Sequence, residues 1–120
     1  MTLVPIRPTG LDGAMSDQGQ HETNVVIGDD TDRSRYEAHM GARLAGVLSY
    51  VDDDDGNRVL QHTVVGDEFG GHGIGSSLAA FALKDAVDAG RKIVPQCTFV
   101  QAWLKKHPER QSMVAHPYEG

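Results

Sequence analysis

The stretch "GDEFGGHGIGSSLAAFAL", residues 66–83, decides the fold, because a glycine-rich loop here joins a strand pattern to a helix pattern. The preceding "RVLQHTVV", residues 58–65, is apolar and β-branched and predicts a strand. From Gly73 to Ala89 apolar residues recur at helical spacing, and Gly90 ends the pattern. "KIVPQC", residues 92–97, predicts a second strand. This order is typical of a right-handed crossover that joins two parallel strands.

Three further strands are predicted upstream, in "NVVIGDD", "RSRYEAHM" and "ARLAGVLSYV", residues 24–30, 33–40 and 42–51. Short turns at Gly41 and at "DDDDGN", residues 52–57, indicate that these strands are antiparallel. We therefore expect an α/β (α+β) fold, in which antiparallel N-terminal strands continue into a parallel βαβ unit and a C-terminal helix.

That last helix is predicted in "TFVQAWLKKH", residues 98–107. Thr98 and Gln101 have the spacing of a capping box, and Pro108 sets its end at His107. The apolar helical residues that we expect in the core are Leu78, Phe81, Phe99, Trp103 and Leu104.

The chain has the size of one domain, with 120 residues of which 39% are hydrophobic. Residues 1–22 are rich in polar residues, glycine and proline, and are predicted to be a disordered tail. Residues 23–120 are predicted to form the folded domain, and we expect a monomer.

Composition argues against several classes of function. Cys97 is the single cysteine, and neither it nor the histidines show the spacing of a metal site, so no metal is expected. The first 57 residues carry 11 acidic and 4 basic side chains and the other 63 carry 6 and 7, without the basic patch of a nucleic-acid binder. No apolar run is long enough for a signal peptide or a membrane span, so we expect the cytoplasm and no membrane partner. The aspartates at 52–55 lack the ligand spacing of a calcium loop and are interpreted as a solvated turn.

Two well-known phosphate loops do not fit the glycines. A P-loop needs lysine where Ser76 stands, and the dinucleotide-binding fingerprint needs glycine at that same position. Gly73 and Gly75 instead match the two small positions of the pyrophosphate loop of acetyl-CoA-dependent transferases. Such a loop lets N–H groups converge on phosphate oxygens at the positive end of a helix. A turn that is merely flexible is the alternative.

The chain resembles the small single-domain branch of the GNAT N-acetyltransferase superfamily over about residues 58–110. The resemblance rests on "LQHTVV", "EFGGHGIGSSL" and "KIVPQCTFVQAWLKKHPE", in that order, and the hairpin at 33–50 agrees with the first strands of the family. It implies that acetyl-CoA lies between the last two strands, with its pantetheine arm on the backbone near Val64 and Val65. It also implies that the pyrophosphate rests on the amides of residues 71–76, namely Gly71, His72, Gly73, Ile74, Gly75 and Ser76.

Three positions depart from the family pattern. Gly70 replaces a Gln or Arg, His72 replaces an Arg, and Val64 replaces an acid that could act as a base. Each lost charged contact costs on the order of 1.5 to 3 kcal/mol of binding. We expect acetyl-CoA binding to persist on backbone amides, but more weakly.

Cys97 and His62 are the candidate catalytic residues. Cys97 precedes a helix, whose positive end favours the thiolate that would accept an acetyl group, although a lone cysteine after a strand can equally be a core residue. His62 is on the neighbouring strand, where it could reach Cys97 or the incoming amine, or be a hydrogen-bonded half-buried histidine.

The predicted function is acetyl transfer from acetyl-CoA to an unidentified amine, a small molecule or a protein. The amine attacks directly, or after transient acetylation of Cys97. The alternative is a non-catalytic CoA or acyl-CoA binding module, which the losses at Val64 and Gly70 would favour. An interaction domain without CoA binding is a third alternative.

Overall fold

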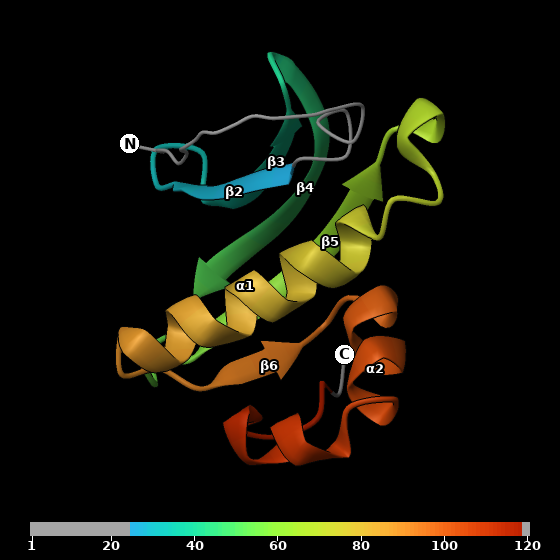
Figure 1. Cartoon of the computed structure of the whole chain (residues 1–120). Helices are drawn as coiled ribbons and strands as arrows, with labels where there is room; N and C mark the ends of the chain where they lie inside the picture. Colours follow the sequence, from blue (N-terminus) through green and yellow to red (C-terminus); the bar gives the residue numbers. More distant parts are fainter. Residues whose placement is uncertain (1–24, 119–120) are drawn as a thin grey trace.

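The computed structural model describes residues 25–118 and contains one five-stranded sheet in the order β2-β3-β4-β5-β6. The strands span Val25–Asp30 (β2), Arg35–Met40 (β3), Arg43–Asp52 (β4), Arg58–Val65 (β5) and Ile93–Pro95 (β6). The four strands from β2 to β5 pair antiparallel, and β5 pairs parallel with β6 (Figure 1). The predicted mixed sheet is confirmed. The predicted tail, residues 1–22, lies outside the described residues.

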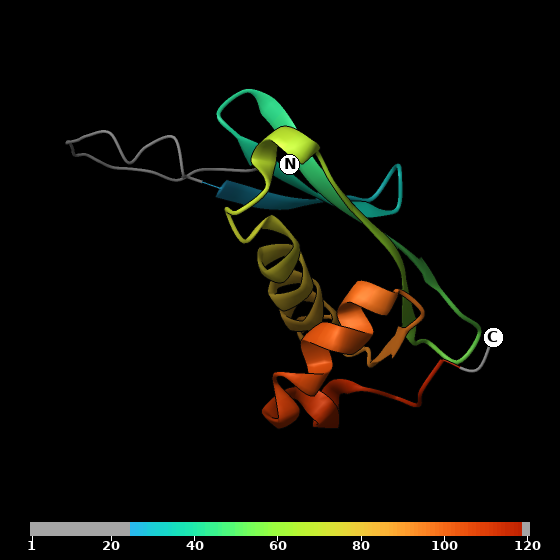
Figure 2. The ribbon, with the colours of Figure 1, turned by 90° about the vertical axis from the view of Figure 1, so that its right-hand side faces the viewer.

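Two α-helices follow the glycine loop, α1 (Ile74–Asp88) and α2 (Thr98–Lys105). A short 3₁₀ helix, η3 (Asp67–Phe69), precedes α1, and a second, η4 (Pro108–Met113), follows α2. Figure 2 shows α1 and α2 on the same side of the long strands. None of the helices in the described part of the chain has the length and apolar character needed to cross a membrane.

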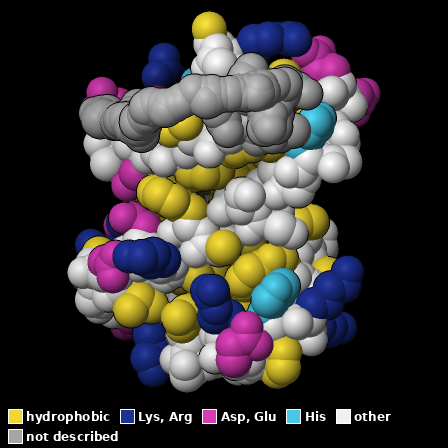
Figure 3. Space-filling view, in the orientation of Figure 1, with side chains coloured by type: hydrophobic (Ala, Val, Ile, Leu, Met, Phe, Trp, Pro, Cys, Tyr) yellow, Lys and Arg dark blue, Asp and Glu magenta, His cyan; other side chains and the backbone are white. Residues whose placement is uncertain are grey.

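The core lies between the sheet and the two helices. Tyr36 and Leu48 from the sheet, Leu78 from α1 and Val100 from α2 are all completely buried. In Figure 3 hydrophobic side chains gather along the middle of the molecule, while charged side chains surround the helices below. Because the core draws on both helices, the start of α1 and the start of α2 are held against the same sheet.

Helix α2 begins at Thr98 as predicted, but its predicted capping box and its predicted end are wrong. Cys97, not Thr98, is the N-cap residue, and no side-chain bond caps the helix. Gln101 Nε2 instead donates to the carbonyl oxygens of Pro95 and Gln96, at 2.9 and 3.4 Å. The helix ends at Lys105, two residues before the predicted end.

Phe99 is also not a core residue, as its side chain is 40% exposed. Trp103 and Leu104 are buried as predicted, at 6% and 3% exposure. Leu78 is fully buried, and Phe81 packs partly buried against the core. The ring of Phe99 lies instead on Gly75, at the start of the other helix.

A network around Arg58 fixes the end of the sheet where β5 and β6 remain paired. Arg58 is 7% exposed, and its guanidinium donates to Asp52 Oδ1 and Oδ2 at 2.7 and 2.9 Å and to the Tyr36 hydroxyl at 2.8 Å. The Tyr36 hydroxyl in turn donates to Asp85 Oδ2 on α1, at 2.9 Å. No local pattern of residues predicted a buried charge here.

The charges of this network reinforce each other. The hydrogen bonds from Arg58 hold the pKa of Asp52 below its usual value, and those bonds also raise the pKa of Arg58 itself. Burial raises the pKa of the Tyr36 hydroxyl, so it stays neutral at physiological pH. The Arg58 guanidinium also lies over the Tyr50 ring, 4.1 Å from its centroid. Strands β3, β4 and β5 and helix α1 are therefore tied together at one end.

Candidate functional site

At the opposite end of the sheet β5 and β6 separate. Their last paired residues are Leu60 and Pro95, although β5 continues to Val65. The final bond between the two segments runs from the N–H of Cys97 to the carbonyl of Leu60, at 2.9 Å. Beyond it, residues 61–65 form a strand edge that β6 does not cover.

A bulge in β5 determines which of its backbone groups point toward this free edge. Ser49 is opposite His62 and Tyr50 is opposite Leu60, so Gln61 has no partner on β4. The Gly66 N–H donates to Ala45 on β4, and ladder bonds alternate along an antiparallel strand. The backbone groups of Thr63 and Val65 consequently face away from β4, toward the side that β6 has left.

The backbone groups of Val64 point the opposite way from those of Thr63 and Val65. Its carbonyl oxygen faces β4, where it would lie 3.0 Å from a Cβ placed on Gly46. The side chain of Val64 is 61% exposed. Of the two valines that the sequence suggested for a pantetheine arm, only Val65 thus directs its backbone to the free edge, and Thr63 is the other residue that does so.

The glycine loop leads from this edge into α1. Gly71 and Gly73 adopt left-handed backbone angles, with φ of 84° and 70°, and Gly73 is the N-cap of α1 without any side-chain cap bond. The first helical bond is donated by Ser77 to Gly73, at 3.0 Å. Within residues 25–118, no backbone hydrogen bond is donated by an N–H from Gly71 to Ser76. These six consecutive donors are available to an acceptor from outside the chain.

Gly46 on β4 allows the start of α1 to lie close to the sheet. A Cβ at this position would be 3.0 Å from Cγ2 of Ile74, the first residue of α1. Ile74 is only 2% exposed, so this contact is part of the core. The close approach brings the uncapped helix terminus next to the free edge of β5.

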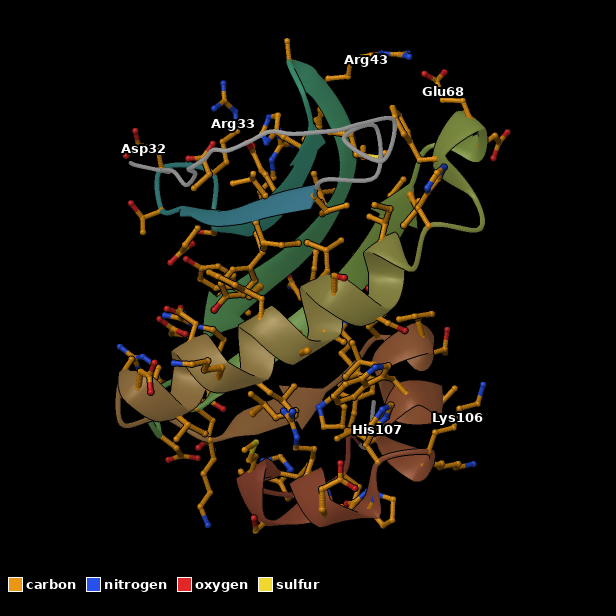
Figure 4. The ribbon with its side chains drawn as sticks, in the orientation of Figure 1. Asp32, Arg33, Arg43, Glu68, Lys106 and His107 are labelled. Carbon is orange, nitrogen blue, oxygen red and sulfur yellow. The ribbon has the colours of Figure 1, made fainter. Side chains whose placement is uncertain are left out.

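An ion pair and an aromatic ring anchor the segment that precedes the glycines. Arg43, at the start of β4, pairs with Glu68 of η3, and Figure 4 shows the two side chains pointing toward each other. The Arg43 guanidinium also lies 5.1 Å from the centroid of the Phe69 ring, which is 9% exposed. Local sequence patterns do not predict these contacts, because the partners are more than 20 residues apart.

The structure brings Cys97 to Thr63 rather than to His62. Cys97 Sγ lies 3.2 Å from Thr63 Oγ1, and the cysteine is 6% exposed. Since side chains alternate along a strand, His62 lies on the other face of the sheet, where it is exposed. The prediction that His62 reaches the thiol is therefore wrong, and Thr63 contacts the thiol instead. Because side chains alternate along β5, a residue next to His62 is the one expected to face Cys97.

The other predicted residues lie together at this end of the molecule. Gly71, His72 and Gly73 are exposed in the loop, while Ile74, Gly75 and Ser76 form the first turn of α1. In the part of the chain that the structure describes, no three metal-ligating side chains gather into a group.

Among the described residues, a strand edge without a neighbour, a helix start with unpaired donors and a buried thiol therefore lie together at one end of the sheet. Comparison with known proteins agrees with this arrangement: a sequence model described as GCN5-related N-acetyl-transferase matches residues 35–113. No curated protein matches the chain significantly. The match covers well over half of the chain, from β3 to the end of η4, so the chain belongs to the GCN5-related N-acetyltransferase family.

Proposed function

We propose that this protein transfers an acetyl group from acetyl-CoA to an amine. The observation that carries the proposal is that two sets of backbone groups without a partner in residues 25–118 lie close together, those of Thr63 and Val65 on β5 and those of Gly71 to Ser76 at the start of α1. An extended amide chain that ends in a diphosphate is complementary to both sets. Its amides pair with the strand edge, and its phosphate oxygens accept bonds from the helix start.

The diphosphate is held chiefly by backbone rather than by side-chain charge. Gly70 and His72 stand where a longer basic or polar side chain would reach the phosphates, and both are exposed. Six N–H groups and the positive end of α1, a helix of 15 residues, provide the attraction instead. We therefore expect an affinity that depends strongly on the backbone shape of residues 71–76.

Phe99 supplies an apolar wall beside the diphosphate site. Its ring covers Gly75 and leaves 40% of its surface exposed. An exposed aromatic ring next to backbone donors suits a ligand whose apolar arm follows a charged group.

For the chemical step we assign the acetyl acceptor to Cys97, whereas His62, on the other face of the sheet, is not placed to take a proton there. The Cys97 thiolate attacks the thioester carbonyl, a new S–C bond forms, the bond to the CoA sulfur breaks, and CoA leaves as a thiolate that takes up a proton. The amine then attacks the acetyl-cysteine, loses a proton to water, and restores the Cys97 thiolate. In direct transfer the amine attacks acetyl-CoA itself, and Cys97 is not acetylated.

Binding and catalysis are tested separately. A melting experiment with acetyl-CoA measures binding, since a ligand at a hundred times its Kd adds about 2.7 kcal/mol of stability. Release of free CoA in a screen of small amines and peptide N-termini measures turnover. Binding without turnover for any amine would favour the CoA-binding module, and no binding at millimolar acetyl-CoA would reject the proposal.

Mass spectrometry after incubation with acetyl-CoA distinguishes the two routes. We expect the mass increase of one acetyl group in the wild type and none in Cys97→Ala. Full turnover by Cys97→Ala would instead establish direct transfer. His62→Gln is the control, because His62 lies on the other face of the sheet, and it should leave both turnover and acetyl-CoA binding close to those of the wild type.

A further inference from the structure

We propose that Thr63 is a positioning residue for Cys97, and that its hydroxyl orients the thiol and donates a hydrogen bond to the thiolate. This inference rests on the proposed function, in which Cys97 carries the acetyl group. It starts from the 3.2 Å contact between Thr63 Oγ1 and Cys97 Sγ, which joins residues 34 positions apart.

Backbone contacts hold both partners in place. The N–H of Cys97 donates to the carbonyl of Leu60, which fixes the residue against β5 just beyond the last paired residue of β6. Thr63 is opposite Leu48 on β4, within the regular ladder between the two strands. The contact therefore joins β5 to the segment that follows β6, at the point where the two strands have just separated.

The surroundings leave the thiol few other partners. Cys97 is 6% exposed, so water gives its sulfur little solvation. Buried charge needs a hydrogen-bond donor, because a thiolate without one loses its hydration without compensation. Of the side chains in the described residues, Thr63 is the one that forms a hydrogen bond with this sulfur.

Charged side chains on the packed elements lie elsewhere. Arg58 of β5 and Asp85 of α1 bind each other at the opposite end of the sheet. His62 of β5 is on the opposite face, and Lys105 is at the last turn of α2, away from its N-cap Cys97. None of these charged side chains is close enough to the thiol to take the place of the Thr63 hydroxyl.

A hydroxyl suits both states of the sulfur. It can accept a bond from the S–H of the thiol and donate one to the thiolate, which can only accept. Bonds to an ionised sulfur are the stronger kind, so Thr63 favours the nucleophilic form. Once the sulfur is acetylated its charge is gone, the bond weakens, and the thiolate regains it when the acetyl group leaves.

The test uses the fact that Cys97 is the single cysteine of the chain, so a thiol reagent reports on it alone. The rate of alkylation by iodoacetamide is measured from pH 5.5 to 10 in the wild type, Thr63→Val and Thr63→Ser. Valine keeps the branched shape that suits a strand and removes the hydroxyl, whereas serine keeps the hydroxyl. We expect the Thr63→Val profile to move to higher pH, with alkylation at pH 7 about tenfold slower. Thr63→Ser should stay close to the wild type.

Additional measurements test the role of Thr63 separately from the proposed function. Melting temperatures show that the variants are folded, and Thr63→Ala replaces Thr63→Val if the latter does not fold. Identical profiles for folded wild type and Thr63→Val, or a shift shared equally by Thr63→Ser, would overturn the role of the hydroxyl. Wild type that neither binds nor turns over acetyl-CoA would refute the proposed function, while the alkylation profiles would still decide whether Thr63 acts on the thiol. With turnover established, Thr63→Val should lower kcat and leave KM for acetyl-CoA unchanged.

Discussion

The ring of Phe99 lies directly on Gly75, so that a Cβ at position 75 would be 2.8 Å from Cζ of the ring. This contact joins the start of α2 to the start of α1. It places an aromatic side chain two residues after Cys97 against the backbone that we propose as the diphosphate site. The close contact, rather than an unusual backbone angle, is what requires glycine at this position.

Gly75→Ala should weaken CoA binding with little effect on the melting temperature. Alanine in place of glycine favours the helix by about 1 kcal/mol, which offsets the cost of moving an exposed ring. The displaced ring no longer forms the wall of the proposed site, so we expect the Kd for CoA to rise about tenfold, measured by calorimetry.

The second variant for this prediction is Gly75→Ala combined with Phe99→Ala. Removing the ring relieves the close contact, so the double variant should bind CoA no worse than Phe99→Ala alone. Equal CoA affinity of Gly75→Ala and wild type would contradict the role given to the ring.

Gly73 and Gly90 provide a matched pair at the two ends of α1. Both have positive φ, 70° and 77°, and a Cβ on either would meet no atom within 4 Å. Alanine at either position should cost about 1 to 2 kcal/mol of stability through backbone strain alone. Only Gly73→Ala should weaken CoA binding, because only this change redirects the donors of residues 71–76. A similar loss of CoA affinity in both variants, measured at equal fraction folded, would argue against the proposed diphosphate site.

The pair of Asp52 and Arg58 predicts how stability depends on pH. Because Arg58 lowers the pKa of Asp52 in the folded protein, Asp52 binds its proton more readily when the chain is unfolded. Its contribution is complete above the usual aspartate pKa, near 4, and is lost as the pH falls through the lower folded value. Unfolding by urea from pH 2 to 7 should show Asp52→Asn less stable than wild type at neutral pH, with a gap that closes in acid.

Asp30 is the control for that experiment. Its pKa is also lowered, by its hydrogen bond with Arg33, but Arg33 is 64% exposed and water screens the pair. Asp30→Asn should therefore change stability much less than Asp52→Asn at neutral pH. Equal effects of the two substitutions would mean that the Arg58 network is not a special source of stability.

The Arg43–Glu68 pair should contribute little to stability and more to ligand binding. Both side chains are more than half exposed, at 67% and 52%, so a double-mutant cycle should give a coupling of about 0.2 to 1 kcal/mol. The pair holds η3, which leads into the glycine loop, so Arg43→Ala should raise the Kd for acetyl-CoA. Exchange of the two charges in Arg43→Glu with Glu68→Arg should restore part of the affinity, and no recovery would contradict an effect that passes through this pair.

Local patterns were sufficient to predict the elements of the fold. Alternating and β-branched residues predicted β5 at its observed bounds, 58–65, and helical spacing predicted α1 to within one residue at each end. Gly41 was predicted to turn the hairpin, and it does so with φ of 62°. These features depend on neighbours within a few residues, which a single sequence displays directly.

Features that depend on distant residues were not predicted. The bulge at Gln61 follows Leu60, the last residue of β5 that pairs with β6, and it appears only in the pairing of β5 with strands from other parts of the chain. The capping box failed because Gln101 finds carbonyls in the β6–α2 connection instead of the helix N-terminus. Phe99 has the spacing of a core residue, but its position at the first turn of α2 directs it onto Gly75.

The Arg58 network has a consequence for how the protein opens. It holds β5 at residue 58, where the strand pairs with β4 and β6, whereas among the described strands the last residues of β5 pair with β4 alone. Amide protons near Arg58 should exchange with deuterium only through global unfolding, while that of Val65 should exchange through local fluctuations. The strand is therefore held rigidly at Arg58 and can fluctuate near Val65, so a ligand can bind beside Val65 without destabilising the rest of the domain.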